Sequence, residues 1–166
     1  DDVWVEQKAK KYYKDRGEIA IGYEEFAKEM TSTCKKFEFM SFDYGEMQAR
    51  PDFSLRIYSK HEVIPFFLTE NEDESIKREE LFAKSDITYD VTFEHVKDAF
   101  LEAGVEFIEL KTQMVALVNM GILELLEILK EKAGEKIYKQ ELEKAKILIM
   151  PNFLGERFKM VRFRKG

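Results

Sequence analysis

The most apolar stretch of the chain, residues 104–134, contains both periodicities of regular secondary structure. A short apolar run at 105–110 follows a glycine, which predicts a buried or half-buried strand. Further along, apolar residues recur at the i, i+3, i+4 and i+7 positions, which place them on one face of a helix. We therefore expect a helix over 122–133 that packs against the rest of the fold, with Leu125 and Leu126 in the core.

The same patterns predict elements on both sides of this stretch. Helical spacing, with glycine and threonine at the boundaries, indicates helices at 1–16, 23–35, 93–103 and 138–145. Alternation and short apolar runs between turn residues indicate strands at 37–42, 53–58, 63–68, 87–91, 105–110, 114–118, 147–149 and 158–163. Strands 53–58 and 63–68 form a predicted hairpin. Pro65 favours an edge position for the second strand, because proline donates no hydrogen bond to a ladder.

This order of elements predicts an α+β fold, with a mixed, mostly antiparallel sheet and helices packed against it. A three-layer α/β sandwich is the alternative. No repeat, low-complexity tract or linker divides the chain, and 166 residues are enough for one sizeable core. We expect a single domain over 1–166, with an N-terminal helical region at about 1–36.

The composition narrows the class of protein. With 45% hydrophobic and 36% charged residues, the chain has the balance of a globular protein and not of a disordered one. Its net charge of −6 argues against a general nucleic-acid binder, whose surface is basic. The chain begins at Asp1, with neither a methionine nor a signal peptide, so we expect a fragment or a trimmed chain.

The single cysteine, Cys34, excludes an intrachain disulfide and a cysteine-based zinc site. We interpret it as a small buried side chain in a protein from a reducing compartment. No apolar run reaches the roughly 20 residues of a membrane-spanning helix. These observations predict a cytoplasmic protein with no membrane partner.

One catalytic pattern joins Asp52, which follows a proline, to Glu109 and Lys111. Metal-dependent nucleases of the PD-(D/E)xK type place such carboxylates on adjacent strands to hold Mg²⁺, and the lysine lies on the same face of its strand as the glutamate. More than fifty residues separate the two halves here, and the chain is acidic, so we expect an ordinary structural role for these residues. The nuclease remains the alternative.

No other cofactor or metal chemistry is indicated. His61 lies in the predicted hairpin turn and His95 on the exposed side of the predicted helix at 93–103, and neither has a second His or Cys at ligand spacing. The eight glycines are scattered singly, so the chain lacks a glycine-rich phosphate loop. We predict no metal and no cofactor.

The two extremes of charge are the candidate partner-binding segments. The acidic one contains Glu72, Asp73 and Glu74, and the basic one contains Arg157, Lys159, Arg162 and Arg164. Charged segments steer association and set specificity, so we expect one of them to contact a protein partner or a second copy of the chain. The alternatives are a solvated acidic loop, a basic edge strand that its charges protect from self-association, and a basic strand that faces the acidic segment 70–80, so that the two segments neutralise each other within one monomer.

The segment Val63-Ile64-Pro65-Phe66-Phe67-Leu68-Thr69, followed by an acidic stretch and a strand–helix–strand unit, resembles the bacterial SseB-type (enhanced serine sensitivity) domain over about half of the chain. The family's usual Asn-Pro after the last strand is replaced here by Asn119-Met120-Gly121. The resemblance carries no catalytic motif and implies a non-enzymatic α+β module.

A full-sized core without a convergent set of polar residues leads to the same conclusion. We predict a non-enzymatic interaction or regulatory protein of the cytoplasm, such as an adaptor, an immunity-type inhibitor or a phage accessory protein.

Overall fold

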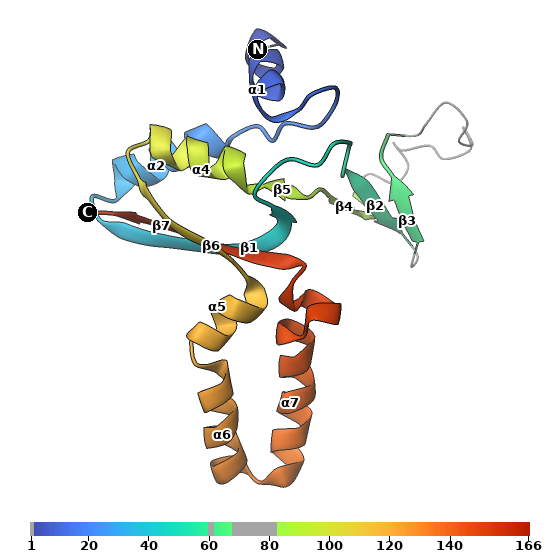
Figure 1. The fold of residues 1–166 in the computed structure, drawn as a ribbon, viewed down its shortest axis with the longest axis vertical. Helices are drawn as coiled ribbons and strands as arrows, with labels where there is room; N and C mark the ends of the chain where they lie inside the picture. The colour runs from blue at the N-terminus through green and yellow to red at the C-terminus, as the bar shows by residue number, and fades with distance from the viewer. Residues whose placement is uncertain (1, 60–61, 68–82) are drawn as a thin grey trace.

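The computed structural model describes residues 2–59, 62–67 and 83–166 (Figure 1). Its helices are α1 (Asp2–Tyr12), α2 (Tyr23–Thr33), α4 (Phe93–Glu102), α5 (Gln113–Asn119), α6 (Ile122–Ala133) and α7 (Glu135–Ile149), followed by a single turn, η1 (Pro151–Gly155). Its strands are β1 (Phe37–Glu46), β2 (Arg56–Ser59), β3 (Glu62–Pro65), β4 (Asp86–Thr88), β5 (Val91–Thr92), β6 (Glu106–Thr112) and β7 (Phe158–Lys165).

Within these ranges the strands form two sheets. The larger sheet has the order β5-β1-β7-β6, in which β7 runs antiparallel to both β1 and β6 while the short β5 runs parallel to β1. The smaller sheet has the order β3-β2-β4 and is antiparallel. The predicted α+β fold with mostly antiparallel sheets is confirmed. The predicted hairpin is confirmed as well, and Pro65 lies on the edge strand β3.

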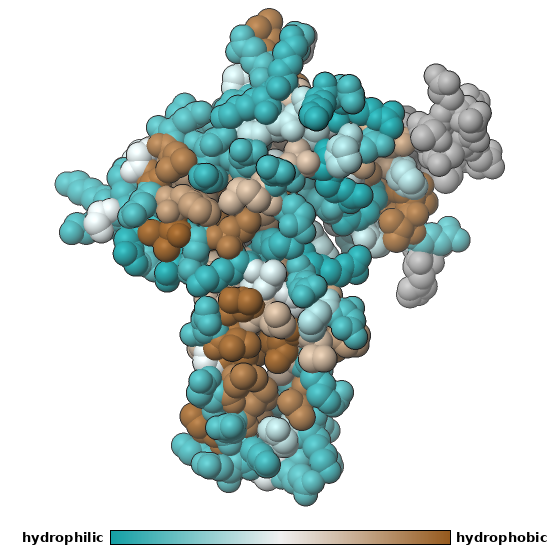
Figure 2. Space-filling view, in the orientation of Figure 1, coloured by the Kyte–Doolittle hydropathy of each residue, from teal (hydrophilic) through white to brown (hydrophobic). Residues whose placement is uncertain are grey.

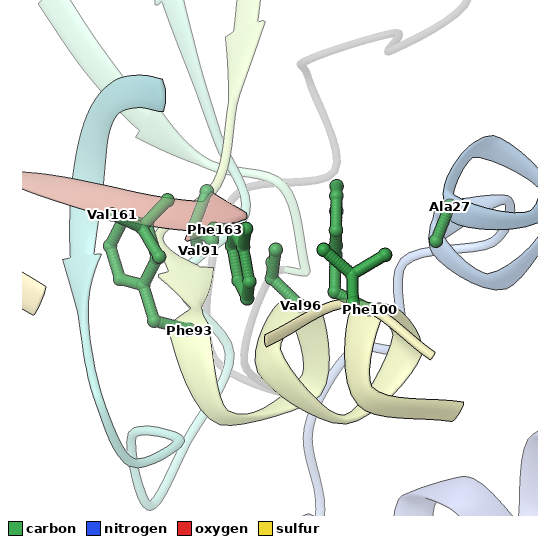
Figure 3. Packing of buried hydrophobic residues seen from close by; sticks show 8 residues of the cluster. Ala27, Val91, Phe93, Val96, Phe100, Val161 and Phe163 are labelled. Carbon is green, nitrogen blue, oxygen red and sulfur yellow. The ribbon is translucent and has the colours of Figure 1, made fainter. Parts of the chain in front are cut away.

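The main core lies between the larger sheet and the helices α2 and α4, which cover one of its faces (Figure 1). The apolar stripe of α4 turns Phe93, Val96 and Phe100 toward the sheet (Figure 3). Phe100 is 1% exposed, and its ring stacks on Phe163 of β7 and Phe39 of β1, with centroids 4.2 Å and 5.1 Å away. Phe39 and Phe163 are cross-strand partners, and such partners point to the same face of a sheet.

Helices α5, α6 and α7 lie beyond the other face of this sheet, and α6 and α7 form a helical hairpin that projects from it (Figure 1). The predicted helix over 122–133 is confirmed, but the prediction that Leu125 is a core residue is wrong. Leu125 is 63% exposed, Leu126 is only half-buried, and α6 has no buried residue. A helix in a two-helix hairpin packs on one neighbour and leaves much of its surface outside.

Two short apolar runs that we predicted as strands are helical. The run 114–118 lies in α5, whose first turn is capped by Thr112, because its Oγ1 accepts the Val115 N–H at 3.4 Å. The run 147–149 is the last turn of α7. Runs of three to five apolar residues have no period that distinguishes a buried strand from a helix, so neighbouring elements decide between them.

In the part of the chain that the structure describes, no helix has the length and apolar character needed to span a membrane. Helices α1 and α2 lie in the region 1–36 that we expected to be helical. The boundaries of the single domain over 1–166 stay a prediction.

Candidate functional site

A cleft of about 580 Å³ lies at the carboxyl end of β1, between the larger and the smaller sheet. Residues 44–46 of β1, the loop positions 50 and 53–55, the smaller sheet, Asp90 and Arg157 line it. In open sheets with parallel strands, ligands bind outside the carboxyl ends of the strands. Since β1 ends here and Asp90, the residue before the parallel strand β5, lines the same cleft, the cleft is the candidate functional site.

Asp90 joins two arginines across the cleft. Its Oδ1 accepts a hydrogen bond from Arg56 at 2.7 Å, and its Oδ2 accepts one from Arg50 at 2.8 Å. Burial opposes ionisation of Asp90, but the hydrogen bonds and positive charges of the two arginines outweigh it and hold the pKa of this carboxyl below its ordinary value. Asp90 is therefore an anion at neutral pH, and it positions the arginines instead of accepting a proton.

A second set of hydrogen bonds holds Asp90 in place. The backbone N–H of Asp90 donates to Ser54 Oγ at 2.7 Å. Ser54 is itself buried, and both its N–H and its hydroxyl donate to the carboxylate of Glu18. Three segments far apart in sequence are thus locked together at one wall of the cleft.

Cationic side chains outnumber anionic ones in the lining. The cations are Arg50, Arg56 and Arg157, and the anions are Asp90 and Glu46. Glu46 is also paired, with Lys159 at 2.8 Å. In a chain of net charge −6, a local excess of positive charge makes this cleft suitable for an anionic group of a ligand.

Asp52 and Glu109, the two carboxylates of the predicted nuclease pattern, pair with different cationic side chains. Asp52 accepts a hydrogen bond from Arg16 at 2.7 Å, whereas Glu109 on β6 pairs with Lys111 at 2.6 Å and with Arg162 at 3.2 Å. Across the described residues, no three or more His, Cys, Asp or Glu side chains are grouped in a way that could hold a metal ion. The structure thus does not bring Asp52 and Glu109 together on a metal.

The basic segment is β7, an interior strand of the larger sheet, so its interpretation as a protected edge strand is wrong. Glutamates of neighbouring strands neutralise most of it: Lys159 pairs with Glu46, Arg162 with Glu109, and Arg164 with Glu38 at 2.6 Å. Arg157 instead lines the cleft. Glu72, Asp73 and Glu74 lie outside the described residues. Binding of a partner by these two segments stays a prediction.

His95, expected on the exposed side of its helix, is 2% exposed. Its Nε2 lies 3.1 Å from a carboxylate oxygen of Glu24, which also pairs with Lys8 at 2.6 Å. Burial raises the pKa of Glu24, but hydrogen bonds from Lys8 and His95 outweigh it and lower the pKa below its ordinary value. This cluster joins α1, α2 and α4, so we assign it a structural role.

Comparison with known proteins gives fold relatives but no sequence relatives. No family model matches the chain, and no curated protein does. Two solved structures from Burkholderia thailandensis are similar. One, an uncharacterized ACR, COG1565 superfamily protein, has a TM-score of 0.72 and 19% identity over 96% of this chain and 42% of its own. The other, a COG1565 superfamily member bound to S-adenosyl-homocysteine and described as a "likely methyl transferase", has a TM-score of 0.71 and 18% identity over 96% of this chain and 40% of its own.

The chain shares their fold. It spans less than half the length of either structure. The predicted SseB-type resemblance is wrong, because these two structures of the same fold are COG1565 superfamily members and no family model matches the chain. The predictions of a non-enzymatic, regulatory protein and of its nuclease alternative are wrong as well, since one of these structures is described as a "likely methyl transferase" and holds S-adenosyl-homocysteine.

Sequence reasoning missed Arg50, Arg56 and Asp90. They come from a loop, from the start of β2 and from the residue before β5, and no motif connects them. The signal that could have found Asp90 is its place directly before an apolar residue that starts a strand. That signal is common, and it says nothing of which arginines lie nearby.

Proposed function

We propose that this chain supplies part of the active site of a methyltransferase-type enzyme, and that the cleft at the carboxyl end of β1 binds an anionic group of a reaction ligand. The observation that carries the proposal is the location of a cationic cleft at the carboxyl end of β1, in a fold shared over 96% of the chain with a protein crystallised with S-adenosyl-homocysteine. Both the product S-adenosyl-homocysteine and an acceptor with a carboxylate carry such a group.

The described residues do not fit the whole of S-adenosylmethionine. Glycine lets the backbone approach a ligand such as a nucleoside closely, and the described residues that line the cleft include one glycine, Gly45. A Cβ at Gly45 would meet the backbone of Val91, so this glycine serves the packing of β1 on β5 and not contact with a ligand. We infer that the nucleoside part is held elsewhere, and that Arg50, Arg56 and Arg157 bind and orient an anionic group.

Guanidinium groups suit this task because their planar donors match a carboxylate in two-point geometry. Asp90 holds Arg50 and Arg56 in fixed positions, so less side-chain entropy is lost when a ligand binds. We place the reaction in the cytoplasm, which agrees with a chain of one cysteine that cannot form an internal disulfide.

The test is a titration of the ¹⁵N-labelled protein with S-adenosyl-homocysteine, followed by two-dimensional NMR. We expect weak binding, with a Kd of about 1 mM, because one part of the site is present. Shifts should concentrate at Gly45, Arg50 and Arg56. Methylthioadenosine, which lacks the amino-acid carboxylate, should shift these resonances much less.

Matched variants test the residues. Arg50→Met should remove the shifts, whereas Arg164→Met, which removes an arginine paired with Glu38 on the sheet, should leave them unchanged. If S-adenosyl-homocysteine at 10 times the expected Kd moved no cleft resonance, the proposed function would be wrong. Equal shifts with methylthioadenosine would refute the role of the anionic group.

A further inference from the structure

Glu18, in the connection between α1 and α2, is a carboxylate that the site described above does not use. Figure 2 shows much hydrophilic surface over the two sheets and the N-terminal segment, where water can solvate a charged side chain. Glu18 is instead half-buried, and in the ranges that the structure describes no cationic side chain pairs with it. A buried charge costs free energy unless hydrogen bonds compensate, so the partners of Glu18 indicate its task.

The described donors to this carboxylate all belong to Ser54. The Ser54 N–H donates to both oxygens of Glu18 at 3.0 Å, and the Ser54 hydroxyl donates to Oε1. The same hydroxyl oxygen accepts the backbone N–H of Asp90 at 2.7 Å. A hydroxyl has one hydrogen, so the hydrogen that points to Glu18 leaves the lone pairs for Asp90. Glu18 thereby fixes the direction of this hydroxyl, and with it the position of Asp90.

Ser54 reaches the arginines of the cleft by two routes. Its carbonyl oxygen accepts a hydrogen bond from Arg56 at 2.9 Å, and its hydroxyl holds Asp90. Asp90 in turn accepts hydrogen bonds from Arg56 at 2.7 Å and from Arg50 at 2.8 Å. A change at Glu18 is therefore transmitted to both arginines, although Glu18 does not line the cleft.

We propose that Glu18 is a positioning residue of the cleft, which acts through Ser54 to hold Arg50 and Arg56 in the arrangement that binds an anionic group. This inference rests on the proposed function, because it takes the cleft as the site of that group. An arginine already held in place loses less side-chain entropy when a ligand binds. Loss of Glu18 should therefore weaken binding without removing any atom that touches the ligand.

The first test measures the Kd of S-adenosyl-homocysteine by NMR titration of variants. Glu18→Ala should raise the Kd about tenfold, and so should Ser54→Ala, which removes only the hydroxyl. Both changes together should again raise it about tenfold, whereas independent effects would multiply to about a hundredfold. Glu18→Gln keeps an oxygen that accepts from the Ser54 N–H and hydroxyl, so its Kd should stay within about twofold of the original.

Glu24→Ala is the control that separates positioning from a general loss of stability. Glu24 is also half-buried, but it pairs with Lys8 and His95 and does not line the cleft. This variant should unfold at lower urea concentration and keep the original Kd. Circular dichroism checks that every variant is folded. If Glu18→Ala is not, Glu18→Asp replaces it, because its shorter side chain keeps the charge but moves the carboxylate away from Ser54.

The second test needs no ligand and is therefore independent of the proposed function. Arg56 donates from Nε to the Tyr58 hydroxyl at 3.0 Å, and NMR measures the exchange of this Nε–H with water. The exchange should become at least about fivefold faster in Glu18→Ala, because Arg56 is held less firmly. Arg164, whose Nε donates to Glu38 at 2.7 Å, is the internal control and should not change.

The outcomes separate this inference from the proposed function. Unchanged exchange at Arg56, or an unchanged Kd in Glu18→Ala when the original protein binds S-adenosyl-homocysteine, would overturn the inference and leave the proposed function standing. A Glu18→Gln variant as weak as Glu18→Ala would overturn it too, since Glu18 would then act by its charge and not through Ser54. If the original protein does not bind S-adenosyl-homocysteine, the proposed function is wrong, and the exchange at Arg56 still decides whether Glu18 positions the arginines.

Discussion

Phe100→Ala tests whether the stack of aromatic rings between α4 and the sheet is the centre of the fold. Phe100 is 1% exposed and lies within 5.1 Å, centroid to centroid, of both Phe39 and Phe163. Removing such a ring costs about 3–5 kcal/mol, because apolar burial is lost and the cavity that remains closes only in part. Domains of this size are stable by about 5–15 kcal/mol, so the change removes a fifth or more of the total.

Equilibrium unfolding in urea, followed by circular dichroism, measures this loss. With a slope of about 2 kcal/mol per molar urea, the midpoint should fall by about 2 M. Ile21→Ala is the matched control, because Ile21 is largely exposed and its truncation should change the unfolding free energy by less than about 0.5 kcal/mol. A loss below about 1 kcal/mol for Phe100→Ala would refute the assignment of this stack as the core.

Two further changes test the polar cluster and the packing of β5. Glu24→Gln should lower the unfolding free energy by about 1–3 kcal/mol at pH 7. Because the pKa of Glu24 is lowered in the folded protein, its contribution to stability is present above the ordinary pKa of about 4.5 and is lost as the pH falls further. In urea melts, the difference in unfolding free energy between Glu24→Gln and the unchanged protein should therefore shrink between about pH 5 and pH 3. A difference independent of pH would contradict this. Gly45→Ala should lower the unfolding free energy, measured by thermal unfolding, by at least about 2 kcal/mol, because a Cβ there meets the Val91 backbone and the φ of Gly45 is +148°. Gly22→Ala is the matched control: the φ of Gly22 is +108°, but a Cβ there would lie in open space, so the loss should be smaller. Equal losses would show that the close approach to Val91 is unimportant.

The helix α4 could be predicted because its apolar residues have a regular helical spacing, and the strand β6 because a short apolar run follows the glycine after that helix. The stripe of Phe93, Val96 and Phe100 has helical spacing, and Gly104 follows the helix end. The hairpin of β2 and β3 was equally clear from its alternation. The segments 114–118 and 147–149 could not be assigned in this way, because their apolar runs are shorter than two helical turns and fit either structure.

Burial was harder to predict than secondary structure. Leu125 belongs to the best amphipathic stripe in the sequence and yet is mostly exposed, because α6 packs in a hairpin away from the sheet. His95 has acidic neighbours in sequence and yet is buried, because the rings of Tyr12 and Tyr23 pack on it and Glu24 of another helix pairs with its Nε2. A sequence pattern shows which face of a helix is apolar, but not whether another element covers that face.

The sequence by itself determined the class of fold and most of the regular elements, since these depend on residues that are close along the chain. Only the tertiary structure decided which charges meet. It placed Asp90 between Arg50 and Arg56, and it placed Arg157, more than sixty residues away, on the same cleft. Side chains separated by thirty or more residues come together through strand order and the packing of two sheets. Those are properties of the whole chain, and no local pattern of residues specifies them.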